Sequence, residues 1–124
     1  MKRYRYRKRD PADFPALRIA IAPAGIRSYR NVMFRLDTGA DISVLPAGIL
    51  SSLNARPFGN VIIADFDDRP TIYQSFAVDL RIANHRFHEV EIVASEGGAA
   101  LLGLDILNQL NINLNGPKKT LTVL

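Results

Sequence analysis

The sequence predicts one all-β domain, a small barrel or a sandwich, and three observations carry this prediction. Apolar residues alternate with other residues at the period of a strand, most clearly in residues 17–21 and 71–83. Turn-forming residues such as those of "APAG" (residues 22–25) separate the apolar runs at short intervals. One good helix is indicated, in residues 104–110, where Leu104, Leu107 and Leu110 recur at three-residue spacing. Short strands with regular turns favour a compact barrel or sandwich.

The strands are expected in the order of the apolar runs. They cover residues 17–21, 31–36, 42–45, 61–64, 71–83, 87–94, 101–102, 112–114 and 121–123. Residues 65–70, "DFDDRP", indicate a hairpin tip, and Pro46 begins a short loop or helical turn. The single expected helix begins near Gly103, with Asp105 in its first turn, where a carboxylate suits the helix dipole.

The formal net charge of +4 comes from the start of the chain, because six of the 16 Lys and Arg residues lie in residues 2–9. From Pro11 onward, basic and acidic side chains nearly cancel. We therefore expect a basic, flexible leader (residues 1–12) and a single folded domain (residues 13–124).

Tyrosines alternate with arginines in this leader, so base stacking and phosphate contacts through residues 2–9 are physically possible. A solvated terminus is the simpler interpretation, and nucleic acid is therefore not the expected partner. Binding to a membrane surface is favoured least.

Other kinds of site are disfavoured by what the sequence lacks. The absence of cysteine excludes disulfides, a thiol nucleophile and thiolate metal sites. No apolar run could span a bilayer and no signal-like segment follows the basic start, so a soluble, cytoplasmic protein is expected. His85 and His88 fall on a strand, where they point to opposite faces, so no metal site is expected. "GGAALLG" (residues 97–103) lacks the Lys-Ser/Thr of a phosphate loop, and no cofactor is expected.

Asp37 lies between two apolar runs, at the expected end of a core strand. It could simply start a turn. A carboxylate in an apolar shell, however, is desolvated and needs hydrogen-bond donors or a shared proton. Thr38 supplies a hydroxyl, and Gly39 supplies a backbone that a ligand or another chain can approach closely. Activation of a water molecule is therefore the alternative to a turn.

Two motifs together carry a resemblance to a known family. "LDTGADISVLP" (residues 36–46) with "LLGLDILNQLNINL" (residues 101–114) resembles the retropepsin-like aspartic proteases, the single-lobed type of retroviruses and retroelements. The resemblance covers residues 16–115 and implies a closed, barrel-like acid-protease fold with one short C-terminal helix. Because the chain has one Asp-Thr-Gly, it also implies a two-fold homodimer in which Asp37 of each subunit forms the catalytic pair.

The resemblance implies peptide-bond hydrolysis by a water that this aspartate pair activates. Support of the active site would come from Thr38, Gly39, Leu102 and Gly103. An extended peptide or protein substrate would contact Ala40, Asp41 and the flap residues Ala64, Asp65 and Phe66.

This chain departs from the family pattern at two places. Leu104 replaces an arginine that in retroviral members holds the residue matching Asp41, so Asp41 should use Arg35, an arginine of the other subunit, or solvent. The flap segment "ADFDDRPTIY" (residues 64–73) lacks glycine, so a polar, stiffer tip is expected. These departures keep open a catalytically silent domain that mediates dimerisation or binds peptides. Because two basic leaders would repel each other, residues 112–114 and 121–123 are expected to form the dimer sheet.

Overall fold

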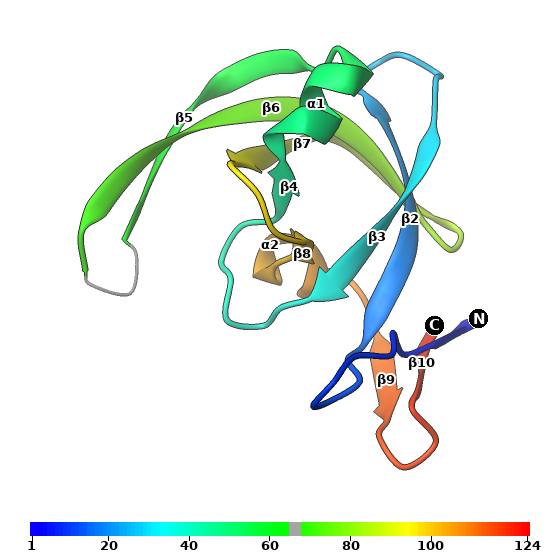
Figure 1. The fold of residues 1–124 in the computed structure, drawn as a ribbon. Coiled ribbons are helices and arrows are strands. Elements are labelled where there is room, and N and C mark those ends of the chain that lie inside the picture. The colour runs from blue at the N-terminus through cyan, green and yellow to red at the C-terminus, as the bar shows by residue number, and fades with distance from the viewer. Residues whose placement is uncertain (65–67) are drawn as a thin grey trace.

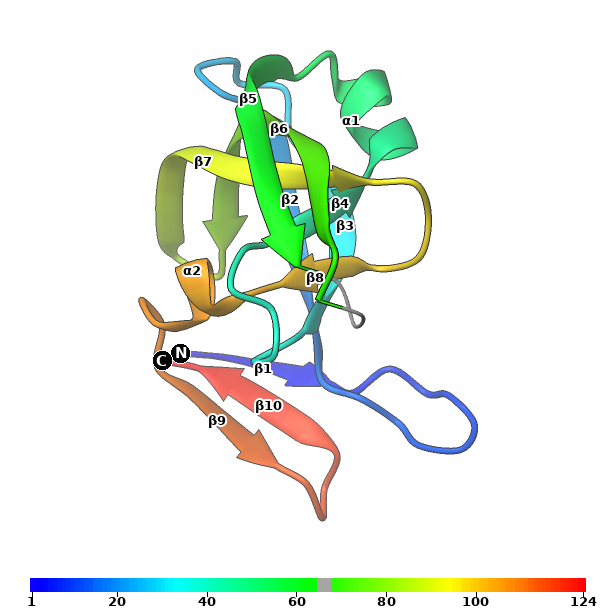
Figure 2. The same ribbon diagram turned by 90° about the vertical axis from the view of Figure 1, so that its left-hand side faces the viewer.

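The computed structural model describes residues 1–64 and 68–124, which form two sheets and two short helices (Figures 1 and 2). The larger sheet contains β2 (Ala16–Pro23), β3 (Arg30–Leu36), β4 (Val44–Pro46), β5 (Arg56–Ala64), β6 (Pro70–Ile82), β7 (His85–Ser95) and β8 (Ala100–Leu102). Its order is β2-β3-β8-β4-β7-β6-β5, and β2 pairs with β6 as well. The sheet thus closes into a barrel of six strands with β5 outside the ring. The expected mostly-β, barrel-like fold is confirmed.

The strand period explains how the barrel is filled. In β2, Leu17, Ile19 and Ile21 are fully buried, whereas Arg18 between them faces outward. Full burial of each such side chain stabilises the fold by roughly 1.5–3 kcal/mol. The same core contains Phe34, Leu45, Leu50, Leu80, Ile82, Ile92, Leu102 and Ile106.

The β5–β6 hairpin extends beyond the barrel. Its strands pair from Arg56 opposite Ala77 to Ala64 opposite Pro70. Figure 1 shows the hairpin curving down on the side where the loop between β3 and β4 lies, and Figure 2 faces this side. The assignment of this hairpin as a flap stays a prediction.

The second sheet joins the two ends of the chain. It contains β1 (Lys2–Arg5), β10 (Thr120–Val123) and β9 (Ile112–Asn115) in the order β1-β10-β9. The sequence predicts a flexible leader, but the structure places Lys2–Arg5 in a strand because Tyr4 and Tyr6 pack against the barrel core. The tyrosine–arginine alternation therefore has a packing explanation.

The expectation of one helix is corrected, since the described residues contain two. In α1 (Ala47–Leu53), Leu50 and Leu53 pack into the core at three-residue spacing. A left-handed Asn54 (φ 55°) ends this helix. The expected helix, α2 (Leu104–Leu107), is only four residues long. Within the described ranges, neither helix is long enough to cross a bilayer.

Candidate active site

Asp37 follows directly after β3, and the barrel holds its backbone. Strands β3 and β8 run parallel with Leu36 opposite Leu102. The Asp37 N–H donates to the Leu102 carbonyl at 2.9 Å, which extends the ladder by one residue. Because Leu102 is fully buried, this hydrogen bond holds the Asp37 backbone in place at the end of the barrel. The half-buried Asp37 side chain projects from this fixed backbone.

The carboxylate of Asp37 is oriented by its own loop. The Gly39 N–H donates to Asp37 Oδ1 at 2.9 Å, and the Ala40 N–H donates to the Asp37 carbonyl at 3.2 Å. A Cβ at position 39 would lie 3.2 Å from Asp37 Oδ1, so glycine allows the loop to close tightly around the carboxylate. Thr38 and Gly39 are exposed.

Gly103 supports this loop from below. It is buried, and a Cβ there would lie 2.8 Å from the Ala40 carbonyl oxygen and 2.9 Å from the Ile42 carbonyl carbon. The Leu104 N–H donates to the same Ala40 oxygen at 2.8 Å. A side chain at Gly103 would therefore push the Asp37 loop away from α2.

A serine–aspartate clamp completes the support, and sequence reasoning did not identify it. Ser43 Oγ donates to Asp105 Oδ1 at 2.8 Å and accepts from the Gly103 N–H at 3.0 Å. The Ser43 N–H donates to Asp105 Oδ2 at 3.1 Å. From the sequence, Asp105 is expected only to interact favourably with the N-terminal end of the helix dipole. The sequence feature that could have indicated this clamp is Ser43, a polar residue inside the apolar run 42–45. The structure shows that Ser43 is fully buried.

The structure describes only some of the residues that the sequence predicts to contact the substrate. Asp41 is exposed, and its carboxylate makes no hydrogen bond or ion pair within the part of the chain that the structure describes. Arg35 is not its partner, because that guanidinium lies over the Phe14 ring, 4.9 Å from its centroid. Ala64 ends β5 and is exposed, whereas the predicted flap residues Asp65 and Phe66 lie outside the described residues.

The hairpin carries an apolar pair on one face. Ile62 and Ile72 are directly opposite each other in β5 and β6, and each is 69% exposed. The two side chains give this face of the hairpin a small apolar surface. No three His, Asp or Glu side chains among residues 1–64 and 68–124 are grouped to hold a metal ion.

The arrangement of these groups suits chemistry that needs a carboxylate held in a fixed orientation. A carboxylate is held by backbone N–H donation at the end of a closed barrel, beside an exposed glycine, and its loop lies on the side of the barrel to which the β5–β6 hairpin extends (Figure 1). A barrel with this loop, pinned by a second strand that ends in Leu-Leu-Gly, defines a domain of the aspartic-protease type. The chain belongs to the family described as "gag-polyprotein putative aspartyl protease", whose profile matches residues 24–109. The resemblance drawn from the two sequence motifs is confirmed.

Solved structures agree with this assignment at the level of the fold. EIAV protease, complexed with the inhibitor HBY-793, has a TM-score of 0.64 at 20% identity over 82% of this chain and 92% of that one. A retropepsin-like aspartic protease from Rickettsia conorii has a TM-score of 0.62 at 14% identity over 98% and 89%. The simian foamy virus (mac) protease has a TM-score of 0.55 at 18% identity over 76% and 92%. No curated protein sequence matches the chain significantly.

Proposed function

We propose that the chain is an aspartic endopeptidase that acts as a two-fold homodimer, with one Asp37 from each copy. The observation that carries this proposal is the one-sided support of the Asp37 loop. Leu102, Gly103 and the Ser43–Asp105 clamp hold it from the barrel side, while Thr38 and Gly39 face solvent. A second copy related by a two-fold axis can therefore approach the exposed side, where identical loops meet.

In this dimer, the two Asp37 carboxylates would share one proton, because like charges in contact do not both ionise. The ionised carboxylate takes a proton from a water, and the water oxygen bonds to the scissile carbonyl carbon. The protonated carboxyl hydrogen-bonds the carbonyl oxygen as it gains charge. The C–N bond then breaks as a proton passes to the leaving nitrogen, which leaves a carboxyl and an amine product. The Gly39 N–H on Oδ1 fixes the orientation of each carboxylate for these transfers. The Thr38 hydroxyls would link the two loops.

The substrate would bind as an extended strand between the Asp37 loops and the two hairpins. On one side of this strand we place the backbone atoms of Gly39 and Ala40, with Asp41. Ala64 would lie on the other side, and Asp65 and Phe66, which lie outside the described residues, stay predicted substrate contacts. Main-chain hydrogen bonds to such a strand supply affinity, and alternate side chains supply specificity. The Ile62–Ile72 pair gives the hairpin an apolar surface for substrate side chains or for the second copy.

For assembly, the strand order refines the expected dimer sheet. β10 is paired on both sides, whereas β1 and β9 are both edges of the β1-β10-β9 sheet, and β1 belongs to the basic leader, where the charges of two copies would repel each other. An edge strand offers unpaired N–H and C=O groups to another chain. We therefore assign the intersubunit contact to β9, and we keep residues 13–124 as the protease domain with residues 1–12 as its leader. The cytoplasmic location stays a prediction.

The function is tested by cleavage of casein and of a peptide library between pH 4 and 7. Wild type should cut, and Asp37→Asn should lose nearly all activity, since the pair then has no ionised member to activate water. Asp41→Asn changes the same group to the same amide four residues away and should retain measurable turnover. Circular dichroism checks that each variant is folded. Equal cleavage by wild type and Asp37→Asn would refute the proposal. If wild type binds peptides without cutting them, the silent-domain alternative is correct.

A further inference from the structure

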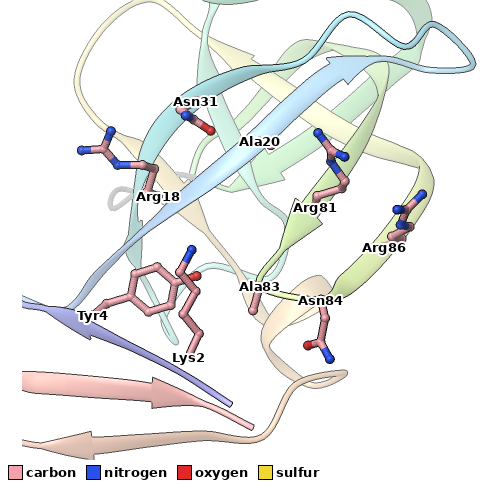
Figure 3. A pocket seen from close by; sticks show the side chains of 9 residues that line it. All are labelled: Lys2, Tyr4, Arg18, Ala20, Asn31, Arg81, Ala83, Asn84 and Arg86. Atoms are coloured by element: carbon pink, nitrogen blue, oxygen red, sulfur yellow. The ribbon is translucent and has the colours of Figure 1, made fainter.

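A basic pocket lies on the outer face of the barrel, where β1 passes beneath β2 and the β6–β7 turn (Figure 3). Its volume is about 400 Å³. Four cationic side chains line it, those of Lys2, Arg18, Arg81 and Arg86, and no carboxylate is among its lining residues. In Figure 1 the N-terminus and the β6–β7 turn lie on the opposite side of the barrel from the β5–β6 hairpin. The pocket is therefore separate from the candidate active site.

Strand register explains why these cationic residues line the same pocket. Arg86 is opposite Arg81, Arg81 is opposite Ala20, and Ala20 is opposite Asn31, so one row crosses β7, β6, β2 and β3. Directly paired residues share a face of a sheet. Arg18 lies two residues before Ala20 and so joins the same face. The small side chain of Ala20 leaves the hollow between the longer ones.

The positive charges of the pocket are not neutralised within the described residues. The Arg81 guanidinium lies over the Tyr29 ring, 3.9 Å from its centroid, and Lys2 Nζ lies 5.3 Å from the Tyr4 centroid. These ring contacts orient the cations without cancelling their charge. Two arginines directly opposite each other in neighbouring strands also destabilise a sheet. A bound anion would remove that repulsion.

The hydroxyl of Tyr4 is a second unusual feature here. It is buried and has no hydrogen-bond partner among the described residues. Burial raises the pKa of Tyr4, and the nearby Ala83 backbone opposes this in part. The hydroxyl therefore stays protonated at neutral pH. Tyr4 lines the pocket, and an unsatisfied buried donor costs free energy, which a ligand oxygen that gained access to this hydroxyl would recover.

We infer that this pocket binds a phosphate group. Guanidinium groups match phosphate oxygens with paired N–H donors, and a lysine adds a point charge. The size of the site selects between anions: although their charged ends point in different directions in Figure 3, the four cations line a single pocket of about 400 Å³, which suits a compact, multiply charged group. The carboxylates of an acidic peptide would instead be spaced along an extended chain at roughly 3.3 Å per residue. The phosphate could belong to a free nucleotide or to a nucleic-acid backbone, and the assignment does not depend on peptidase activity.

The test compares two double variants that change the net charge equally. Arg81→Gln/Arg86→Gln removes two pocket cations. Arg3→Gln/Arg27→Gln removes two cations that do not line the pocket. Binding of pyrophosphate and of ATP is measured by calorimetry at 150 mM salt, and binding of a labelled single-stranded oligonucleotide is measured by anisotropy. We expect the pocket variant to weaken binding by about tenfold or more, since charge-assisted contacts are lost, and the control variant by less than about twofold.

A third variant, Ala20→Met, fills the hollow without changing charge and should also abolish binding, which keeps the test valid if the double variant unfolds. Tighter binding of the oligonucleotide than of ATP identifies a nucleic-acid backbone as the source, and equal or weaker binding identifies a free phosphate compound. The inference is overturned if both double variants weaken binding equally, if no phosphate probe binds wild type, or if an oligoglutamate peptide binds more tightly than every phosphate probe.

Discussion

Because Gly103 has only a hydrogen atom as its side chain, the Asp37 loop can lie close to α2. The Ala40 and Ile42 backbone occupies the space that any Cβ at this position would need. Backbone atoms cannot rotate away as the end of a long side chain can. The position of the candidate catalytic carboxylate therefore depends on a residue that touches no substrate.

Gly103→Ala should therefore destabilise the fold by about 1–3 kcal/mol, the usual range for overpacking. It should also lower kcat more than it raises KM, because the loop that orients Asp37 must shift. Gly48→Ala is the matched control: it lies in α1 with no atom within 4 Å of its added Cβ, and it should stabilise the protein by roughly 0.5–1 kcal/mol. Urea unfolding and peptide-cleavage kinetics measure both effects. A Gly103→Ala protein as stable and active as wild type would contradict this account.

Sequence patterns predict the parts of the site that depend on local chemistry. Asp37 and Gly39 follow from one motif, because Gly39 lets its own loop close around the carboxylate. Gly103 follows from the second motif only through the family resemblance, because the backbone that it contacts, at Ala40 and Ile42, is distant in the sequence. The pairing of Ser43 with Asp105 spans 62 residues and could not be predicted, since periodicity contains no information on which distant polar groups meet. The flap tip at Asp65 and Phe66 stays a prediction.

Among the secondary-structure elements, strand β1 likewise depends on a distant pairing that the sequence could not predict. Its alternating pattern is visible in the sequence, but its partner is β10 at the other end of the chain. The excess of positive charge suggested a solvated leader, whereas packing of Tyr4 and Tyr6 decides the outcome. The α1 helix was underestimated for a related reason, because Leu50 and Leu53 alone form too short a pattern to indicate a helix.

One carboxylate, that of Asp13, helps to hold the connection between β1 and β2, together with the backbone bridge between Arg7 and Phe14. Asp13 Oδ2 accepts from Lys119 Nζ at 3.0 Å, and Asp13 Oδ1 accepts from the Arg9 N–H at 3.1 Å. The hydrogen bond from Lys119, followed by that from Arg9, lowers the pKa of Asp13 below its ordinary value. Because the folded-state pKa is depressed, the stabilisation is fully present above about pH 4 and is lost as the pH falls through the folded-state pKa.

Asp13→Asn should therefore lower the Tm at pH 7 and have progressively less effect as the pH falls below about 4. Asp10→Asn, an equal charge change at an exposed residue of the same segment, should have little effect across this range. Thermal unfolding of wild type and both variants between pH 7 and 2 measures the difference. A Tm gap between wild type and Asp13→Asn that widened on acidification would reverse the sign of this linkage.

For the whole molecule, closure of the barrel explains why one chain is stable yet, in our proposal, provides half of an active site. Pairing of β2 with β6 leaves the six ring strands without a free edge. In our proposal, the surfaces that a second copy contacts are the Asp37 loop, the β5–β6 hairpin and the β1-β10-β9 sheet. The sequence predicts the need for a second aspartate, but the available edge depends on the order β1-β10-β9, which is a tertiary property.

Leu114→Asp tests whether β9 carries the intersubunit contact. Leu114 lies on this edge strand and is 57% exposed, and a buried, unpaired carboxylate there would oppose association. Ile26→Asp is the control, because Ile26 is 55% exposed but lies in the β2–β3 connection. Sedimentation velocity should show Leu114→Asp shifted to monomer at concentrations where wild type and Ile26→Asp are dimeric. Cleavage activity should fall in parallel and recover as protein concentration rises, since each active site needs two copies. A fully dimeric Leu114→Asp protein would exclude β9 from the interface, whereas a monomeric wild type that still cleaves would exclude the shared Asp37 pair.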